Sequence, residues 1–210
     1  MKKFITFILI VFAMYFAMSA YQPQQTDFLG EVNPVNKAAT LFLDCGITTG
    51  TGIVVTDQMV FTAFHVVEDV SSCTIETRDG AKVSVYVVNR DPFNDFAILM
   101  TAKSVFKDAY SINCGMAEQG VTYHAAGYPA GRGLTIVKIT PRAEYITIAG
   151  RNPSDAFRGF DGKMRPGMSG GPVVTPDGSV IGFISARLAD DAKVGLVKEM
   201  VDTAICEDRH

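Results

Sequence analysis

The sequence has few of the residues with which proteins bind nucleic acids or structural metals. Its 210 residues include three histidines, and Lys2 and Lys3 supply two of the 19 basic side chains, against 22 acidic ones. No basic run follows them, and phosphate binding needs clustered Lys and Arg. The four cysteines form no Cys-x-x-Cys pair, which excludes a zinc ribbon. We therefore expect no nucleic-acid partner, no metal site and no cofactor.

A long apolar run occurs only near the start. Lys2 and Lys3 precede the apolar residues 4–18, and small residues at 19–20 lead into a polar stretch. This order of charged, apolar and small residues is typical of a secretory signal peptide. We expect a signal peptide at 1–20, a leader at 21–37 and a secreted or periplasmic protein without a stable membrane span. An uncleaved membrane anchor remains the alternative, although the run is shorter than the ~20 residues of a usual spanning helix.

The rest of the chain contains neither tandem repeats nor low-complexity tracts. Short apolar runs separated by turn residues recur instead, as in an all-β sandwich or barrel. One set of candidate strands comprises 39–44, 52–56, 59–62, 73–78, 82–89 and 96–100, and a second comprises 121–126, 134–140, 144–149, 172–175 and 179–185. A strand near Val194 is left open.

The end of the chain has a helical pattern. Apolar residues recur there with the i, i+4 spacing of one buried stripe, at Leu196, Val197, Met200, Val201, Ala204 and Ile205. We thus divide the chain into a first β domain (38–102), a connecting segment (103–119), a second β domain (120–193) and a C-terminal helix with its tail (194–210).

One turn carries a candidate nucleophile. Ser169 lies in the sequence Gly167-Met168-Ser169-Gly170-Gly171-Pro172, where backbone amides can converge on one point. A serine hydroxyl needs a base to take its proton, and the oxyanion that it creates needs donors fixed in advance. The pattern indicates an acyl-transfer site.

His65 is the best candidate for the base. It follows an apolar β-type run, whereas His124 lies inside an alternating apolar run and His210 is the last residue. Asp95 directly precedes the apolar run 96–100, where its carboxylate can hold one imidazole nitrogen while the other faces the serine. Asp91 is the rival carboxylate, but it stands before a proline in a turn.

These residues together resemble the trypsin/chymotrypsin-like serine peptidases. The shared motifs are Thr-Ala-x-His ending at His65, Asp-x-Ala-Ile-Leu beginning at Asp95, and Gly-x-Ser-Gly-Gly-Pro around Ser169. The sequences at 52–55, 79–80 and 126–129 are similar to the HtrA-type and glutamyl-endopeptidase-type bacterial enzymes. The resemblance spans roughly residues 38–206.

The resemblance implies a fold and a set of roles. The fold is all-β, with two six-stranded antiparallel β-barrels and a C-terminal α-helix, and the site lies between the barrels. His65, Asp95 and Ser169 form the catalytic triad, and the amides of Gly167 and Ser169 form the oxyanion hole. Trypsin-like digestive enzymes have an aspartate just before the nucleophile, which binds a freed amino terminus. Met168 replaces it here, so that activation mechanism is not available.

The cysteines and the specificity pocket are also interpreted through the family. Export would permit disulfides, and four cysteines allow three pairings. The resemblance implies Cys45 with Cys73 and Cys114 with Cys206, free buried thiols being the alternative. It places a specificity pocket along 160–168 and 184–187, with Lys163, Ile184, Ser185, Ala186 and Arg187 as substrate-binding candidates.

Several functional alternatives stay open. The basic residues Lys163, Arg165 and Arg187 could favour an acidic residue before the scissile bond, or they could simply face water. A trypsin-like serine endopeptidase acting on proteins or peptides is the main hypothesis. A catalytically silent protein-binding module on the same scaffold and an esterase are the others. The α/β-hydrolase order, in which histidine comes last, does not fit, and the sequence leaves the oligomeric state undetermined.

Overall fold

A computed structural model describes residues 33–77, 80–147, 156–187 and 193–207 of the chain. The expected signal peptide at 1–20 and the leader up to residue 32 lie outside the described residues. Among the described residues, none of the helices has the length and apolar character needed to cross a membrane.

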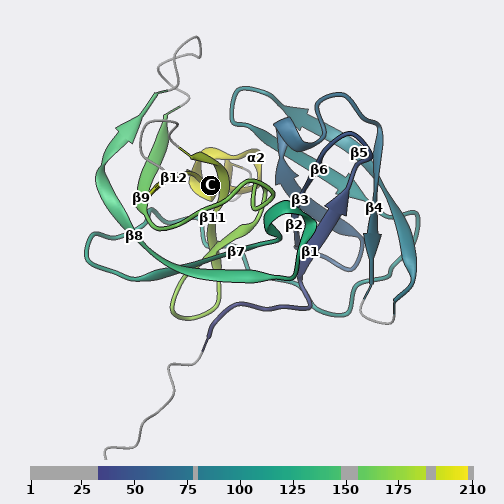
Figure 1. Ribbon diagram of the computed structural model, residues 1–210, viewed down its shortest axis with the longest axis horizontal. Helices are drawn as coiled ribbons and strands as arrows, with labels where there is room; N and C mark the ends of the chain where they lie inside the picture. Colours follow the sequence, from purple (N-terminus) through teal and green to yellow (C-terminus); the bar gives the residue numbers. More distant parts are fainter. Residues whose placement is uncertain (1–32, 78–79, 148–155, 188–192, 208–210) are drawn as a thin grey trace, which may run out of the picture. The chain divides into compact units, whose positions relative to one another are not determined.

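The first six strands close into an antiparallel barrel in the order β1-β2-β3-β6-β5-β4 (Figure 1). Their bounds are β1 Thr40–Asp44, β2 Thr49–Val54, β3 Met59–Ala63, β4 Ser72–Glu76, β5 Lys82–Asp91 and β6 Phe96–Met100.

The next six strands close into a second antiparallel barrel in the order β10-β11-β12-β9-β8-β7. Their bounds are β7 Tyr123–Gly127, β8 Thr135–Ile146, β9 Phe157–Asp161, β10 Pro172–Val174, β11 Val180–Arg187 and β12 Val194–Glu199. The prediction of an all-β chain with two six-stranded barrels is confirmed.

Each barrel has an apolar interior that its strand pattern produces. Leu43, Val60 and Leu99 are fully buried in the first barrel, because alternate side chains of a strand point to the same face. A separate buried cluster, which includes Phe160 and Val197, fills the second barrel. The first cluster also extends into the strands β7, β10 and β11. The contact between barrels is therefore part of the apolar core.

One aromatic pair marks this contact. The rings of Phe96 at the start of β6 and Phe183 in β11 lie 5.9 Å apart at a tilt. Phe96 directly follows Asp95, and Phe183 lies two residues before Ser185. The packing of these rings therefore brings the candidate site residues of the two barrels together.

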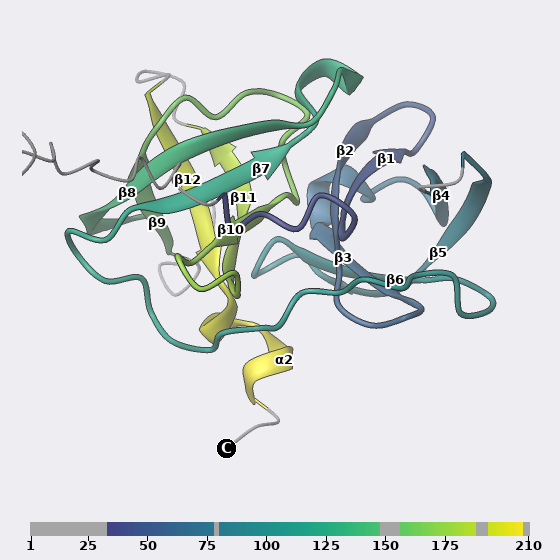
Figure 2. The ribbon, with the colours of Figure 1, turned by 90° about the horizontal axis from the view of Figure 1, so that it is seen from below.

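The segment between the barrels is anchored to both of them. The Tyr110 amide donates to the Val54 carbonyl of β2, and the Asn113 amide donates to the Val180 carbonyl of β11. A disulfide joins Cys114 of this segment to Cys206 in the short helix α2 (Ala204–Glu207). Figure 2 shows α2 beside the connecting segment.

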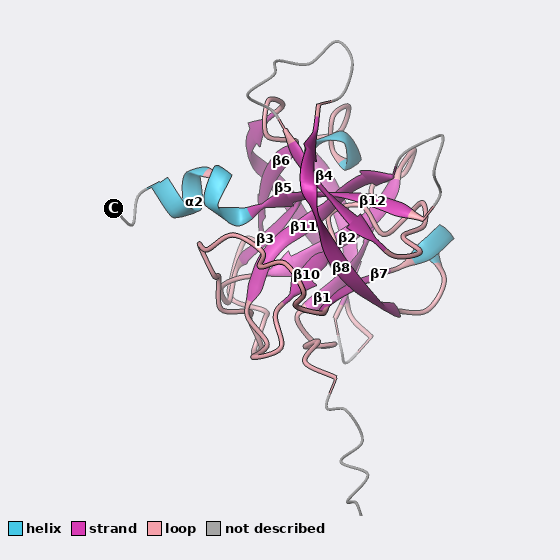
Figure 3. Ribbon diagram, turned by 90° about the vertical axis from the view of Figure 1, so that its left-hand side faces the viewer, coloured by secondary structure: helices cyan, strands magenta, loops and turns pink. Residues whose placement is uncertain are grey.

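The predicted C-terminal helix over 194–210 is wrong for its first part. Residues Val194–Glu199 form strand β12, which pairs with β9 and β11. A 3-10 turn, η3 (Met200–Asp202), and the single turn α2 follow (Figure 3). The i, i+4 pattern failed because every residue of β12 is buried, including Lys198 and Glu199, so the strand lacks the alternation by which a half-buried strand is recognised.

Strand β9 was not among the predicted strands, and the predicted strand 144–149 is partly the end of the long strand β8. The charged Arg158 interrupts the apolar sequence by which β9 would be recognised, yet its side chain is buried. Its guanidinium lies 3.3 Å from the Glu199 carboxylate and donates to the carbonyls of Ala117 and Arg142. Buried charges of this kind need such partners.

Candidate active site

His65 and Asp95 form a hydrogen-bonded pair at one end of the first barrel. His65 lies in the 3-10 turn η1 (Phe64–Val66), which directly follows β3, and Asp95 precedes β6. These strands are paired, with Ala63 opposite Phe96, so their ends bring the two side chains together. The His65 Nδ1 atom lies 3.0 Å from each carboxylate oxygen of Asp95.

Backbone contacts fix the Asp95 carboxylate further. Asp95 has no exposed surface, and its Oδ1 atom accepts a hydrogen bond of 3.1 Å from the His65 amide. Its φ of +52° lies in the left-handed region that few non-glycine residues adopt. Its carbonyl accepts a bond of 2.9 Å from the Phe64 amide. The surrounding contacts therefore hold a backbone conformation of the kind that often occurs at functional sites.

Ser169 lies in the loop between β9 and β10 of the second barrel. Its hydroxyl donates to the Ser185 carbonyl at 3.3 Å. Within the described part of the chain, Ser169 Oγ makes no hydrogen bond to His65. A rotation of the Ser169 side chain is therefore needed before the imidazole can take its proton.

Ser185 connects the serine with the histidine–aspartate pair. Its carbonyl accepts the Ser169 hydroxyl, and its own hydroxyl donates to Asp95 Oδ2. The turn at Gly170 also packs closely on the first barrel, because a Cβ there would lie 2.9 Å from the Ala63 amide nitrogen. Ala63 is two residues before His65. The structure thus brings all three predicted triad residues to one place.

The residues before Ser169 form a tight turn. The Met168 amide donates to the Arg165 carbonyl at 3.1 Å, and Gly167 has a φ of +93°. A type II turn has this bond and a positive φ at its third residue, and Pro166-Gly167 is a favoured central pair for it. Glycine is required here for a second reason, since a Cβ would lie 2.6 Å from the Tyr128 carbonyl oxygen.

The amides of Gly167 and Ser169 are available as donors. Neither has a hydrogen-bond partner among the residues that the structure describes. The neighbouring carbonyls are held: Pro166 O accepts from the Ala130 amide at 3.1 Å, and Met168 O accepts from the Gly171 amide at 2.9 Å. Because N–H and C=O point in opposite directions across a trans peptide, these bonds also orient the two free amides.

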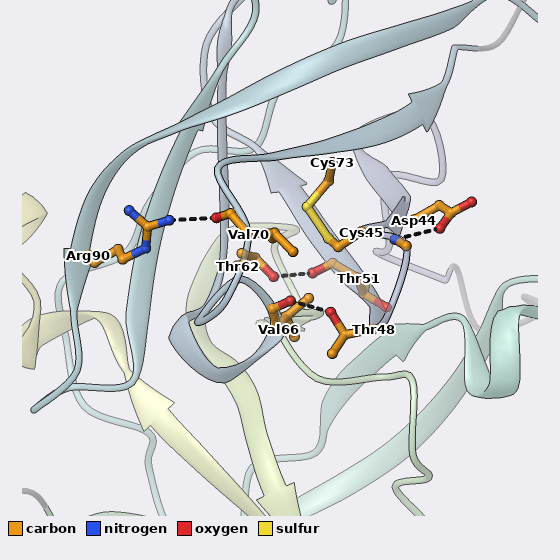
Figure 4. The surroundings of a disulfide bond; sticks show 10 residues. Asp44, Cys45, Thr48, Thr51, Thr62, Val66, Val70, Cys73 and Arg90 are labelled. Atoms are coloured by element: carbon orange, nitrogen blue, oxygen red, sulfur yellow. Dashed lines mark hydrogen bonds between the residues drawn. A yellow bond between two sulfur atoms is a disulfide. The ribbon is translucent and has the colours of Figure 1, made fainter.

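A disulfide braces the segment that carries His65 (Figure 4). Cys45 at the end of β1 is bonded to Cys73 in β4. Three residues after Cys45, the Thr48 hydroxyl donates to the Val66 carbonyl of η1 at 2.6 Å. The structure contains the same two disulfide pairs that the family resemblance implies, and no cysteine is free.

The predicted specificity residues have different environments. Ile184 and Ser185 are buried in β11, and Ala186 is half-buried. Lys163 is exposed, as is Arg165. Arg187 ends β11 opposite Gly195, and its side chain lies outside the described part of the structure.

Met164 lies in the predicted pocket segment 160–168, but sequence reasoning did not single it out. It is buried between the exposed Lys163 and Arg165, and a Cβ on Gly195 of β12 would overlap its sulfur. The apolar residue between two cations was the available signal, because successive side chains of an extended segment point to opposite sides.

The rival candidates are placed elsewhere. The Asp91 carboxylate accepts from the amides of Phe93 and Asn94 and caps the turn before Asp95. His124 is buried in β7, and its Nδ1 atom has no hydrogen-bond partner within the described ranges. Across these ranges, no three His, Cys, Asp or Glu side chains gather as metal ligands would.

Comparisons with curated proteins find bacterial serine proteases. The chain is 29% identical over 144 residues to the serine protease Do-like HtrA of Bacillus subtilis, covering 65% of this chain and 32% of that protein. It is 32% identical over 146 residues to a probable periplasmic serine endoprotease, DegP-like, of Chlamydia muridarum, covering 65% of this chain and 28% of the relative. The chain thus spans about a third of the length of these relatives.

Solved structures of proteases have the same fold. The active form of the Rv3671c protease from M. tuberculosis superposes with a TM-score of 0.66 and 25% identity, covering 76% of this chain and 74% of that one. The serine endoprotease from Yersinia pestis superposes with a TM-score of 0.67 and 20% identity, covering 81% of this chain and 61% of that one, which shows the fold alone.

The family model of a trypsin-like peptidase domain matches residues 50–183. The match begins in β2 and ends in β11, so it contains His65, Asp95 and Ser169. Since it covers more than half of the chain, the protein belongs to the family of trypsin-like peptidase domains.

Proposed function

We propose that the protein is an exported serine endopeptidase in which Ser169 attacks a peptide carbonyl, His65 transfers protons and Asp95 orients His65. The observation that carries this proposal is the hydrogen-bond chain from Ser169 through Ser185 to the His65–Asp95 pair. Its end members, Ser169, His65 and Asp95, are the three residue types of the triad mechanism, and Ser185 links them.

The reaction begins with a rotation of the Ser169 hydroxyl from the Ser185 carbonyl toward His65 Nε2. His65 takes the hydroxyl proton as Ser169 Oγ bonds to the substrate carbonyl carbon. Asp95 accepts a hydrogen bond from the Nδ1–H group of His65 and stabilises the imidazolium that forms. His65 then gives its proton to the leaving amine, which leaves an acyl-enzyme. Water, deprotonated by His65, bonds to the acyl carbon, the bond from that carbon to Ser169 Oγ breaks, and His65 returns the proton to Ser169 Oγ as the acid product leaves.

The oxyanion is stabilised by the amides of Gly167 and Ser169. Both are free donors in a turn whose carbonyls are already bonded, so the donors need little reorganisation when charge develops. Such pre-organised donors are each worth on the order of 100- to 1000-fold in rate.

We infer an apolar pocket for the residue before the scissile bond, along the segments 160–168 and 184–187. Ile184 and Met164 are buried near it, and Met164 fills the space above Gly195. Lys163 and Arg165 face solvent, which favours the water-facing alternative over an acidic preference. Small or medium apolar side chains fit this arrangement best.

Export is supported by the N-terminal pattern of residues 1–20 and by the two disulfides, which persist in oxidising compartments. The matched relative from Chlamydia muridarum is named as a probable periplasmic endoprotease. Secretion of a full-length chain that loses residues 1–20, measured by mass spectrometry of the exported protein, tests this part.

Covalent labelling tests the proposed chemistry. The wild type should react with a fluorophosphonate probe at Ser169 and cleave an unfolded protein substrate, whereas Ser169→Ala should do neither. His65→Ala should fold and lose activity by at least about 10⁴-fold, because triad members act as a unit. A folded wild-type protein that is neither labelled nor active refutes the peptidase proposal.

One observation favours a second candidate, a silent binding module. The Ser169 hydroxyl is bonded to Ser185 and not to His65 in this structure. If that state persists with substrate, peptides bind without cleavage. Isothermal titration of an unfolded protein substrate against the wild type and Ser169→Ala separates the two, since a binding module binds equally in both forms and a peptidase degrades the ligand only in the first.

A further inference from the structure

Thr51 makes two hydrogen bonds to the loop that carries Ser169. It lies in β2 of the first barrel and has no exposed surface. Its amide donates to the Ser169 carbonyl at 2.8 Å, and its hydroxyl donates to the Gly167 carbonyl at 2.9 Å. One residue of the first barrel therefore holds the carbonyls of both residues whose amides would form the oxyanion hole.

The Thr51 hydroxyl also accepts a hydrogen bond of 3.1 Å from the Tyr128 amide. Tyr128 begins the loop in which the Ala130 amide holds the Pro166 carbonyl. That carbonyl shares a peptide plane with the Gly167 amide. The same hydroxyl thus connects to both peptide groups that flank the Gly167 Cα atom, to one directly and to the other through the 128–130 loop.

Thr51 is itself fixed within the first barrel. Its carbonyl accepts from the Thr62 hydroxyl at 2.8 Å (Figure 4), and Thr62 lies in β3, three residues before His65. The position of Thr51 therefore depends on the strand that leads to the imidazole. Hydrogen bonds through Thr51 thus connect β3, the strand that leads to His65, with the turn that carries the proposed oxyanion donors.

We propose that Thr51 is a positioning residue, which sets the orientation of the Gly167 and Ser169 amides for the oxyanion. The inference rests on the proposed function of Ser169 as the nucleophile. A hydroxyl suits this position because it can donate to one group and accept from another at once. Valine has the same shape but offers neither bond, whereas serine keeps both.

The expected effect is on the chemical step. Thr51→Val leaves the Gly167 carbonyl and the Tyr128 amide without these partners, so the oxyanion donors shift. Small misplacements of catalytic groups cost on the order of 100-fold in rate. We expect kcat to fall by about 10- to 100-fold with KM nearly unchanged, because the substrate is bound by other groups. The separate variant Thr51→Ser, which keeps the hydroxyl, should have a kcat within a few-fold of that of the wild type.

Thr40→Val is a matched control. Thr40 is equally buried in the adjacent strand β1, and its hydroxyl contacts Tyr110 and the Asn36 carbonyl away from the nucleophile loop. This variant loses a buried hydroxyl network of similar size. It should unfold at a lower temperature while its kcat stays that of the wild type.

The experiment measures kcat and KM for a peptide amide, together with affinity for a peptide aldehyde, whose adduct places an oxygen in the oxyanion hole. Thr51→Val should weaken aldehyde affinity by about the same factor as kcat. Equal kcat in Thr51→Val and the wild type, a change confined to KM, or failure of Thr51→Ser to restore activity would each overturn the inference.

Two further measurements separate a loss of folding, or of the proposed activity itself, from a loss of positioning. If Thr51→Val does not fold, Thr51→Ala is measured per folded molecule, with the folded fraction taken from circular dichroism. If neither folds, Thr51 serves folding and the positioning role is overturned. A wild type that neither cleaves nor labels at Ser169 refutes the proposed function itself, whereas an active wild type with an equally active Thr51→Val refutes only the role of Thr51.

Discussion

The Ser185 hydroxyl in β11 of the second barrel donates a hydrogen bond to the buried Asp95 carboxylate at the first barrel. The bond crosses between two domains of separate sequence. Because the Ser185 carbonyl also accepts the Ser169 hydroxyl, this one residue contacts both ends of the proposed proton-transfer system.

Removal of that hydroxyl should slow catalysis. Ser185→Ala keeps the carbonyl that Ser169 contacts but takes a donor from a buried charge, a type of bond worth about 1.5–3 kcal/mol. We expect kcat to fall by roughly 10- to 100-fold. Ser179→Ala, which removes a hydroxyl that donates to Asp177, should leave peptide hydrolysis unchanged. A wild-type kcat in Ser185→Ala would show that the Ser185 hydroxyl does not support catalysis through Asp95.

Gly167→Ala should abolish most activity and leave the fold intact. The residue has a positive φ, and a Cβ would lie 2.6 Å from Tyr128 O and 2.7 Å from Ala130 N, so the turn must shift away from the oxyanion position. We expect a loss of at least about 100-fold in kcat. Gly133→Ala, where a Cβ meets nothing within 4 Å, is the control. Retention of wild-type kcat in Gly167→Ala would place the oxyanion donors elsewhere.

Met164→Ala should change which residue is accepted before the scissile bond. Removing the side chain over Gly195 deepens the pocket, and apolar pockets discriminate by about 1–3 kcal/mol per methylene. In a peptide library, kcat/KM for Phe relative to Ala should rise about tenfold or more. Lys163→Ala is the companion variant, because an exposed lysine should not alter the preference. If Lys163→Ala reduces cleavage after Glu, Lys163 contacts the substrate and the hypothesis of a preference for acidic residues before the scissile bond is supported.

The disulfides should contribute mainly through the unfolded chain. They close loops with sequence separations of 28 and 92 residues. Loop entropy predicts that removing both cysteines of a pair costs about 3–4 kcal/mol for Cys45–Cys73 and about 4–5 kcal/mol for Cys114–Cys206. Urea unfolding of the paired Cys→Ala variants measures this. Thiol titration of the denatured, unreduced wild type should find no reactive group, and four would refute both bridges.

Stability should decline in alkali because of Tyr110. Burial raises the pKa of its hydroxyl from 10.0 to about 12, so the folded state keeps a proton that the unfolded chain loses. Below pH 10 this difference in pKa adds about 2–3 kcal/mol to the free energy of unfolding. That contribution is lost as the pH rises from about 10 to 12. Urea unfolding of the wild type should show this slope, and Tyr110→Phe should show a shallower one. Equal slopes exclude Tyr110 as the cause.

Much of the site could be predicted from local sequence. His65 and Asp95 stand at the ends of apolar runs, and the Pro166-Gly167 pair encodes the turn before Ser169. What failed was the recognition of buried charge. Arg158, Lys198 and Glu199 look like solvent-facing residues, yet all three are buried. Arg158 and Glu199 are paired with each other across 41 residues, and Lys198 contacts the distant Ala156 carbonyl besides the nearby Asp202, so β9 was missed and β12 was taken for a helix.

The sequence by itself determined which residues are the candidates for the chemistry and the order in which they occur, because strand ends, tight turns and the trypsin-like motifs are formed by neighbouring positions. Only the tertiary structure decided how those residues meet. Thr51 has no local signal, and the sequence marked Ser185 only as a substrate-binding candidate, since their contacts are hydrogen bonds between two barrels whose packing brings together groups 77 to 116 residues apart. Contacts of that kind depend on closure of both sheets, which no short stretch of sequence specifies.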